Sequence, residues 1–192
     1  MTARTHDLAA VTALGIVVLL EPARTVTLAT AIVAVFANLI GGITPDVDQP
    51  TAPFWRNLPV GKFFGKIFDR LLGGHRFLSH SLLGLALFGF AAHWLLLFLQ
   101  PIMKNVNIGL VWWAFIIGMV SHLFMDTLTK EGVPWLLPIP VKFGLPPLKA
   151  FRITTGKAVE TFGVFPVLLV ANAYLYYANY HKLLDLLHHH LV

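Results

Sequence analysis

The sequence contains no cysteine and few charged residues. None of its 192 residues is Cys, so it can form neither a disulfide framework nor a thiolate metal site, and imidazole and carboxylate groups must bind any metal. Lys, Arg, Asp and Glu make up only 12% of the chain, whereas 57% is hydrophobic and the mean hydropathy is +0.74. A soluble domain carries about twice that share of charge. The composition therefore predicts an integral membrane protein.

Five apolar runs approach the length of about 20 residues that a membrane-spanning helix needs. They lie at residues 5–20, 26–43, 80–99, 108–128 and 161–180. The first is short enough to suggest a signal peptide, but no basic cluster precedes it and Glu21-Pro22 makes a poor cleavage site. Because no repeat of 20–50 residues is visible, we expect one all-α transmembrane domain over residues 1–192.

The basic residues are distributed unequally between the two sides of this arrangement. Three lie on the side of the 21–25 turn, the 100–107 turn and the C-terminus, namely Arg24, Lys104 and Lys182. The other eleven are Arg4, Arg56, Lys62, Lys66, Arg70, Arg76, Lys130, Lys142, Lys149, Arg152 and Lys157. The positive-inside rule then predicts a cytoplasmic N-terminus, with the loops 44–79 and 129–160 on the same side.

Two segments of these loops have the composition of interfacial structure. Residues 62–72 alternate basic and apolar positions at helical spacing, which predicts a helix on the anionic inner leaflet or, alternatively, a helix packed on the protein. Residues 133–147 contain too many prolines for a regular spanning helix and are expected to enter the interface. Whether this segment forms a lid stays open.

The potential metal ligands are concentrated at the predicted cytoplasmic ends of the spans. Ionisable residues at such positions are costly and usually functional. The candidates are His6 at the first span, Asp46 and Asp48 after the second, His75, Arg76, His80 and Ser81 before the third, His122 and Asp126 ending the fourth, and Arg152 and Glu160 before the fifth.

Two carboxylate motifs have spacings suited to binding one ion. His122 and Asp126 are four residues apart on a helix, so their side chains share a face. Asp46 and Asp48 follow Pro45, which disfavours helix at Thr44, and in an extended segment both carboxylates would point the same way. The alternatives are an ordinary hydrogen-bonded pair in the first case and an Asp-capped turn in the second.

The sequence His75-Arg76-Phe77-Leu78-Ser79-His80-Ser81 supplies two imidazoles around an expected helix start, with Ser79 as a possible N-cap. The planar guanidinium of Arg76 matches a phosphate, although Arg and His also snorkel at membrane boundaries. His93 lies in mid-span and His181 on the opposite side, so we exclude both. Residues 187–192 could be a natural tail or a cloning remnant, and we exclude them as well.

Taken together, these motifs resemble the YdjM-like family of inner-membrane metal-dependent hydrolases. The resemblance rests on His6, Pro45-Asp46-Val47-Asp48, His75-Arg76 with Ser79-His80-Ser81, Ser121-His122 with Asp126, Leu128-Thr129 and Gly132-Val133, and Arg152 with Thr155-Gly156 and Glu160. They occur in the same order over most of the chain. The departures are small: Ser79 stands where Thr is commoner, Ala10 replaces a Gly, and Lys157 stands where Ser is frequent. A fainter similarity in ligand style points to zinc-dependent phospholipase C.

The resemblance and the ligand set together predict a metal-dependent hydrolase of a bacterial or archaeal inner membrane. The expected ligands of two or more Zn²⁺ ions, with Mn²⁺ possible, are His6, Asp46, Asp48, His75, His80, His122, Asp126 and Glu160.

The catalytic roles are expected to fall to Asp46, Glu160, Arg76 and Arg152. The metal ions would activate a water that attacks phosphorus, the two arginines would orient the phosphate, and a carboxylate such as Asp46, Asp48 or Glu160 would act as base or support the ligands. The expected partners are membrane lipid and a lipid phosphate or soluble phosphoester, with no nucleic acid. A metal or ion transporter and a non-catalytic membrane scaffold are the alternatives.

Overall fold

The chain is described by a computed structural model that covers residues 1–20, 26–139 and 141–188. Five long apolar helical segments confirm the predicted spans, with edges shifted by a few residues: Ala3–Leu20, Leu28–Asp48, Leu82–Ile102, Ile108–Thr127 and Glu160–Ala178. Their cores are α1 (Ala3–Leu20), α2 (Leu28–Ile43), α5 (Leu82–Leu99), α6 (Ile108–Thr127) and α7 (Phe165–Ala178). The described residues form no strand, and the predicted all-helical class is confirmed.

Shorter elements complete the chain. They are the 3₁₀ turns η1 (Thr44–Asp48), η2 (Leu78–His80), η3 (Gln100–Ile102) and η4 (Lys149–Phe151), the π-helical turn η5 (Glu160–Val164), and the helices α3 (Pro53–Arg56), α4 (Gly61–Leu71) and α8 (Tyr180–His188). The helix predicted at 62–72 is confirmed as α4, whereas α8 was not expected. The predicted 21–25 turn and the end of the 187–192 tail lie outside the described residues.

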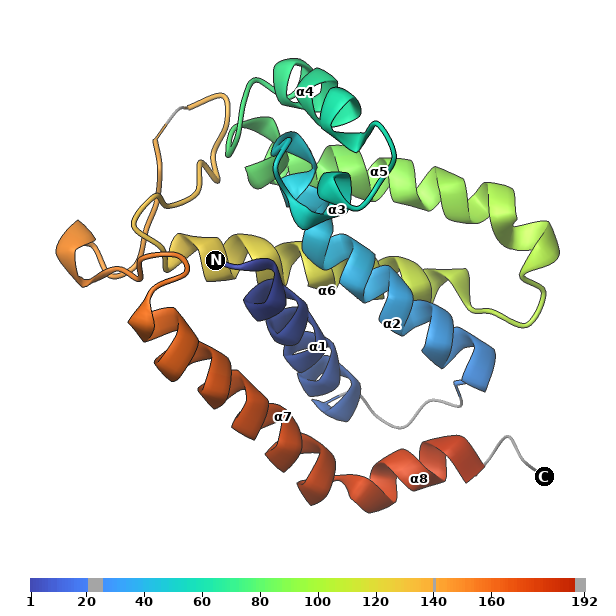
Figure 1. Cartoon of the computed structure of the whole chain (residues 1–192). Helices are drawn as coiled ribbons and strands as arrows, with labels where there is room; N and C mark the ends of the chain where they lie inside the picture. The colour runs from blue at the N-terminus through green and yellow to red at the C-terminus, as the bar shows by residue number, and fades with distance from the viewer. Residues whose placement is uncertain (21–25, 140, 189–192) are drawn as a thin grey trace.

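Helix α6 is the centre of the bundle and packs most closely against α2 (Figure 1). A Cβ added at Gly118 would lie 2.1 Å from the Asn38 carbonyl oxygen, and one added at Gly41 would lie 2.1 Å from the Phe115 carbonyl oxygen. Glycine is therefore required at both contacts, as is usual where membrane helices approach closely. The Asn38 amide also donates to the Ala114 carbonyl at 3.0 Å across the same interface.

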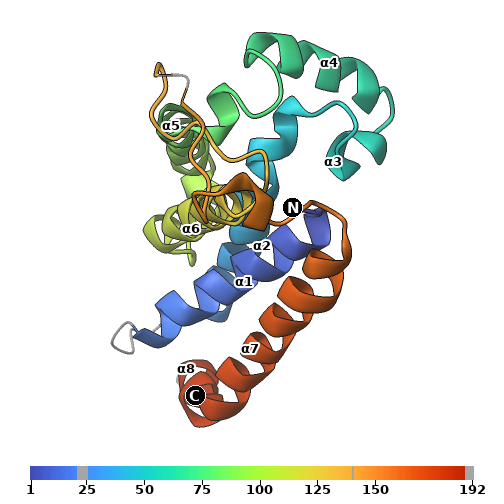
Figure 2. The same cartoon turned by 90° about the vertical axis from the view of Figure 1, so that its left-hand side faces the viewer.

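The remaining spans surround this pair. Helices α1 and α5 pack against α6, and α7 packs along α1 (Figure 2). The outer faces of α5 and α7 are largely exposed, with only 11% and 6% of their span residues buried. Because those exposed faces are apolar, they are suited to hydrocarbon rather than water. The loops 44–81 and 128–159 join the spans at the end of α6 that carries His122 and Asp126.

Candidate metal centre

Asp46 and Asp48 are placed by a 3₁₀ turn and not by the extended segment that the sequence suggested. Thr44 has helical dihedral angles (φ −58°, ψ −41°) despite the proline that follows, because α2 continues directly into η1. Successive residues of a 3₁₀ helix are about 120° apart, so residues two apart diverge. The carboxylates consequently face different neighbours: Asp46 faces His80 and His122, whereas Asp48 faces the loop that leads to η2.

His122 is fully buried, and its protonation pattern follows from its hydrogen bond. Its Nδ1 lies 2.6 Å from the carbonyl oxygen of Gly42, at the end of α2. Since a carbonyl only accepts, Nδ1 must carry the proton, and Nε2 then presents a lone pair. This Nε2 is buried without a hydrogen bond to the described residues. The imidazole therefore directs an unpaired acceptor into the protein.

His80 is held in the same tautomer by a short relay. The Ser79 hydroxyl donates to Asp48 Oδ2, and its oxygen lies 2.9 Å from His80 Nδ1. Because the Ser79 hydroxyl hydrogen is donated to the carboxylate, the serine oxygen accepts a hydrogen bond from the Nδ1–H of the imidazole. His80 Nε2 is thereby left as a second buried lone pair without a hydrogen bond in the described chain.

The two lone pairs converge on two carboxylate oxygens. His80 Nε2 lies 3.7 Å from both Asp46 Oδ1 and Asp126 Oδ2, and His122 Nε2 lies 3.6 and 3.8 Å from the same two atoms. Metal–ligand bonds of about 2.0–2.2 Å in a tetrahedral zinc site imply ligand–ligand separations of about 3.3–3.6 Å. These four His–Asp separations thus lie within a few tenths of an ångström of that spacing, and Asp46, His80 and His122 form a group with metal-ligand spacing.

Asp126 also pairs with two buried cationic groups. Its Oδ1 accepts from the α-ammonium group of Met1 and lies 3.2 Å from His6 Nε2, while its Oδ2 lies 2.6 Å from Arg76 Nη2. His6 stacks on His122 with ring centroids 3.7 Å apart. The trio of His6, His122 and Asp126 has metal-ligand spacing as well. Within this trio, the ammonium group of Met1 lies where a metal cation would bind, 2.9 Å from His6 Nε2.

Arg76 lies inside the site in a strained backbone conformation. Its φ of 58° belongs to the left-handed region, which costs about 1–3 kcal/mol outside glycine. Two hydrogen bonds hold it there. The backbone N–H of Arg76 donates to Asp48 at 2.9 Å, and the guanidinium donates to the Thr129 hydroxyl at 2.9 Å. The guanidinium fork is therefore engaged with protein groups, including Asp126, and is not free as the sequence suggested.

A third possible ligand group contains Asp46, Asp48 and His75. His75 Nδ1 lies 2.9 Å from Asp48 Oδ1, and its side chain is one-third exposed. Burial alone would lower the pKa of His75, but the hydrogen bond to Asp48 and the charges of Asp48 and Asp46 outweigh it and raise the pKa above 6.5. This imidazole is partly open to water, unlike those of His80 and His122, so the group is a less enclosed candidate than theirs.

Two predicted site residues lie apart from these groups. Glu160 accepts four hydrogen bonds, from the N–H of Thr2 at 2.6 Å, the hydroxyls of Thr2 and Thr5, and the N–H of Gly156 at 2.7 Å. These bonds fill its carboxylate, which differs from the expectation that it binds metal or acts as base. It instead ties the N-terminal segment to η5.

Arg152 likewise donates elsewhere, to the carbonyl oxygens of Pro146 and Pro147 at 2.8 and 2.9 Å. Its guanidinium therefore does not reach the cluster of Asp46, His80, His122 and Asp126, contrary to the predicted phosphate contact. His93 packs beside Trp112 and His181 beside Tyr180, away from the cluster, as expected. The predicted N-cap Ser79 is wrong: Ser81 caps α5 by accepting from the N–H of Gly84 at 3.0 Å.

Several groups of the site have roles that the sequence did not indicate. The hydroxyl of Ser79, the carbonyl of Gly42, Thr129 and the terminal amine of Met1 are the main examples. Ser79 and Thr129 both belong to the motifs of the family resemblance, but the bonds of Ser79 to Asp48 and His80 and the bond of Thr129 to Arg76 could not be foreseen. Backbone groups such as the Gly42 carbonyl have no sequence signature at all.

The adjacent serines provide a matched test of the relay. Ser79→Ala should lower metal affinity by about 10–100-fold, as loss of a partner behind a metal-binding His does. Ser81→Ala should cost about 1 kcal/mol of helix stability and leave metal affinity unchanged. Metal titration and thermal unfolding of both variants in detergent measure these effects. Equal metal affinity in the two variants would show that the relay does not orient His80.

Comparison with known proteins agrees with this architecture. The model of the family described as YdjM inner membrane protein matches residues 1–183. The uncharacterized protein YvsG of Bacillus subtilis (strain 168) is 28% identical over 146 residues, which cover 76% of this chain and 79% of that protein. No solved structure matches. A family match that spans the five helices and every residue of the cluster leads to one conclusion: this chain belongs to the YdjM family of inner membrane proteins.

Proposed function

We propose that this protein is a membrane-embedded, metal-dependent phosphoester hydrolase whose metal is held by Asp46, His80, His122 and Asp126. One observation carries the proposal: two buried imidazole lone pairs meet two carboxylate oxygens at 3.6–3.8 Å. The four acceptors make no hydrogen bond among themselves, and Arg76 meets only one of them, Asp126 Oδ2, so a cation at their centre would stabilise the arrangement. Histidine and carboxylate ligands are typical of zinc, and Mn²⁺ is the alternative.

The tautomers of the two imidazoles support this assignment. Histidines that bind metal generally donate their other ring N–H to a carbonyl or carboxylate, which fixes the ring and increases its basicity. His122 does so directly to Gly42, and His80 does so through Ser79 to Asp48. A purely structural role in helix packing would not explain why the Nε2 atoms of His80 and His122 are both buried without hydrogen bonds in the described chain.

A bound divalent ion would supply Lewis acidity, which acidifies water and stabilises negative charge on phosphoryl oxygens. Asp46 lies at the boundary between the cluster and water, since its side chain is 19% exposed whereas His80 and His122 are fully buried. In the proposed reaction Asp46 takes a proton from the attacking water as the water oxygen bonds to phosphorus and the bond from phosphorus to the alkoxide oxygen of the leaving group breaks. That proton then passes to the alkoxide oxygen.

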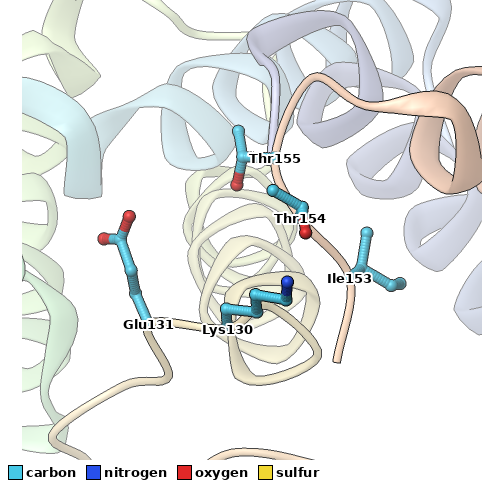
Figure 3. Close-up of a pocket in the computed structure, with 5 residues that line it drawn as sticks. All are labelled: Lys130, Glu131, Ile153, Thr154 and Thr155. Carbon is cyan, nitrogen blue, oxygen red and sulfur yellow. The ribbon is translucent and has the colours of Figure 1, made fainter. Parts of the chain in front are cut away.

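Arg76 would offer positive charge to the phosphate through its Nε, because its two Nη atoms already contact Thr129 and Asp126. Its Nε is buried without a hydrogen bond and lies 3.5 Å from the carboxylate of Glu131, which is 63% exposed. Glu131 lines a pocket of about 150 Å³ together with Lys130, Ile153, Thr154 and Thr155 (Figure 3). The basic and hydroxyl groups of this pocket are suited to the polar part of a substrate, and we propose it as the approach to Arg76.

The proposed substrate is a lipid phosphate on the cytoplasmic side. Eleven of the 14 lysines and arginines lie in the sequence regions on the site's side of the spans, which favours a cytoplasmic site by the positive-inside rule. The four ligands are carried by η1, η2 and the last turns of α6, close to the limits of the spans. Such a position corresponds to the depth of lipid headgroups.

The test is metal analysis and an activity screen on detergent-purified protein. We expect stoichiometric zinc or manganese and metal-dependent release of phosphate or alcohol from phospholipids or lipid-linked phosphates. A folded protein that stays metal-free after reloading would overturn the proposal and favour the scaffold. Metal binding together with metal flux in proteoliposomes, and without hydrolysis, would favour a transporter.

A further inference from the structure

Helix α4 presents an unusual combination of faces. The side buried against the protein is formed by glycine: a Cβ at Gly61 would lie 2.0 Å from the Trp55 carbonyl oxygen, and one at Gly65 would lie 2.8 Å from Pro50 Cα. A helix of a water-soluble domain buries its apolar stripe against the core instead. The close glycine contact therefore leaves the large apolar side chains of α4 on the outside.

The exposed apolar stripe is formed by Phe63, Phe64, Ile67 and Leu71. Their exposed fractions are 61%, 48%, 38% and 73%. Positions 63, 67 and 71 recur every four residues, so they form one continuous stripe along the helix. Because α4 is too short to cross a bilayer, this stripe is not the lipid-facing side of a spanning helix.

A basic stripe runs beside the apolar one. Lys62, Lys66 and Arg70 are also four residues apart, all three are exposed, and none makes an ion pair with another residue of the described chain. At about 100° per residue, this row lies about 100° around the helix from the row of Phe63, Ile67 and Leu71. An apolar stripe bordered by cations is the pattern of helices that lie in the interface of anionic membranes.

We propose that α4 docks on a lipid leaflet with its apolar stripe among the acyl chains and its basic stripe on anionic headgroup phosphates. The occupant of this surface is an anionic lipid, since the three unpaired cations match its charge and the exposed phenylalanines and isoleucine match its chains. Each Lys or Arg near such a surface contributes favourably to binding.

Docking of α4 bears directly on the cluster. Its C-terminal turn is bonded to the loop that carries His75 and Arg76, since the Gly74 N–H donates to the Asp69 carbonyl at 2.7 Å. At its other side α4 packs on η1 and Trp55, whose indole donates to the Val47 carbonyl at 2.9 Å. A docked α4 therefore holds the accessible edge of the cluster, Asp46 and His75, at headgroup depth. Only this consequence for substrate access depends on the proposed hydrolase.

The absence of cysteine permits a direct test by single nitroxide labels. Ile67→Cys and Lys66→Cys place labels on neighbouring positions of the two stripes, in nanodiscs with or without anionic lipid. We expect the label at 67 to be accessible to oxygen and shielded from a water-soluble nickel chelate, and the label at 66 to be accessible to nickel. In a second series, Lys62→Gln, Arg70→Gln and Ile67→Cys are combined, and the anionic-lipid dependence of the shielding should be lost.

Three results would overturn the proposal. If the labels at 66 and 67 were both accessible to nickel, α4 would lie in water. If the label at 67 were shielded from both nickel and oxygen, a protein partner or a second copy would cover the stripe. Equal shielding of the label at 67 from nickel in neutral and anionic lipid would show that anionic headgroups do not contribute to the docking of α4. These measurements need no bound metal and no turnover, so their outcome is separate from that of the proposed hydrolase.

Discussion

His122→Ala is expected to remove the metal from the purified protein, whereas His93→Ala should leave it bound. His122 is fully buried and directs its only unpaired nitrogen at Asp46 and Asp126, 3.6 and 3.8 Å away. Loss of a partner behind a ligand costs about 10–100-fold in metal affinity, so loss of a ligand itself should cost at least the upper end of that range. Hydrolysis should fall with the metal content.

His93 is the matched control because it is an imidazole within a span that does not belong to the cluster. It packs beside Trp112, with ring centroids 6.2 Å apart, between α5 and α6. Metal content by mass spectrometry, measured on detergent-purified wild type and both variants at equal folded fraction, decides the outcome. Equal metal content in all three proteins would exclude His122 as a ligand and remove the main support for the proposed centre.

Asp126→Asn is expected to cost both the metal and much of the stability, whereas Asp46→Asn should cost the metal alone. Asp126 is 1% exposed and pairs with the α-ammonium group of Met1 and the guanidinium of Arg76, which are also buried. Neutralising it leaves the ammonium group without its carboxylate partner and Arg76 with only the exposed Glu131 at 3.5 Å, and breaking a buried pair in this way costs about 3–5 kcal/mol.

Asp46 separates the two effects, because it faces His80 and His122 but pairs with no lysine or arginine of the described chain. Its side chain is also partly hydrated, so the amide can be solvated. Thermal unfolding in detergent, followed by circular dichroism beside metal analysis, distinguishes the variants. If Asp126→Asn unfolded like wild type, the network around Arg76 would not be the structural anchor that its contacts indicate.

Much of the architecture followed from the sequence because lipid imposes simple requirements on it. Runs of about 20 apolar residues with almost no charge have one stable form in a bilayer, so the five spans and the absence of strands could be predicted. The ligand candidates could be identified for a related reason: ionisable groups such as His122 and Asp126 are costly in an apolar span and persist where they have a function.

The sequence could not determine how these residues are divided among different tasks. It treated Glu160 and Asp48 as ligands, yet threonine hydroxyls and backbone N–H groups fill the carboxylate of Glu160, and Asp48 orients His75 and His80. It predicted an extended segment around Asp46, where α2 continues into a 3₁₀ turn. Helix continuation from a long apolar span outweighed the local preference of the residue before proline.

The sequence by itself determined that this is a membrane protein of five spans with imidazoles and carboxylates at the span ends. The tertiary structure decided which of them meet: the close glycine contacts of α2 and α6 bring the Gly42 carbonyl to His122, and the bonds of Asp48 and Ser79 direct His80 to the same place. The physical reason is that periodicity and composition act over neighbouring residues, whereas the direction of a lone pair depends on a hydrogen bond made by a distant part of the chain.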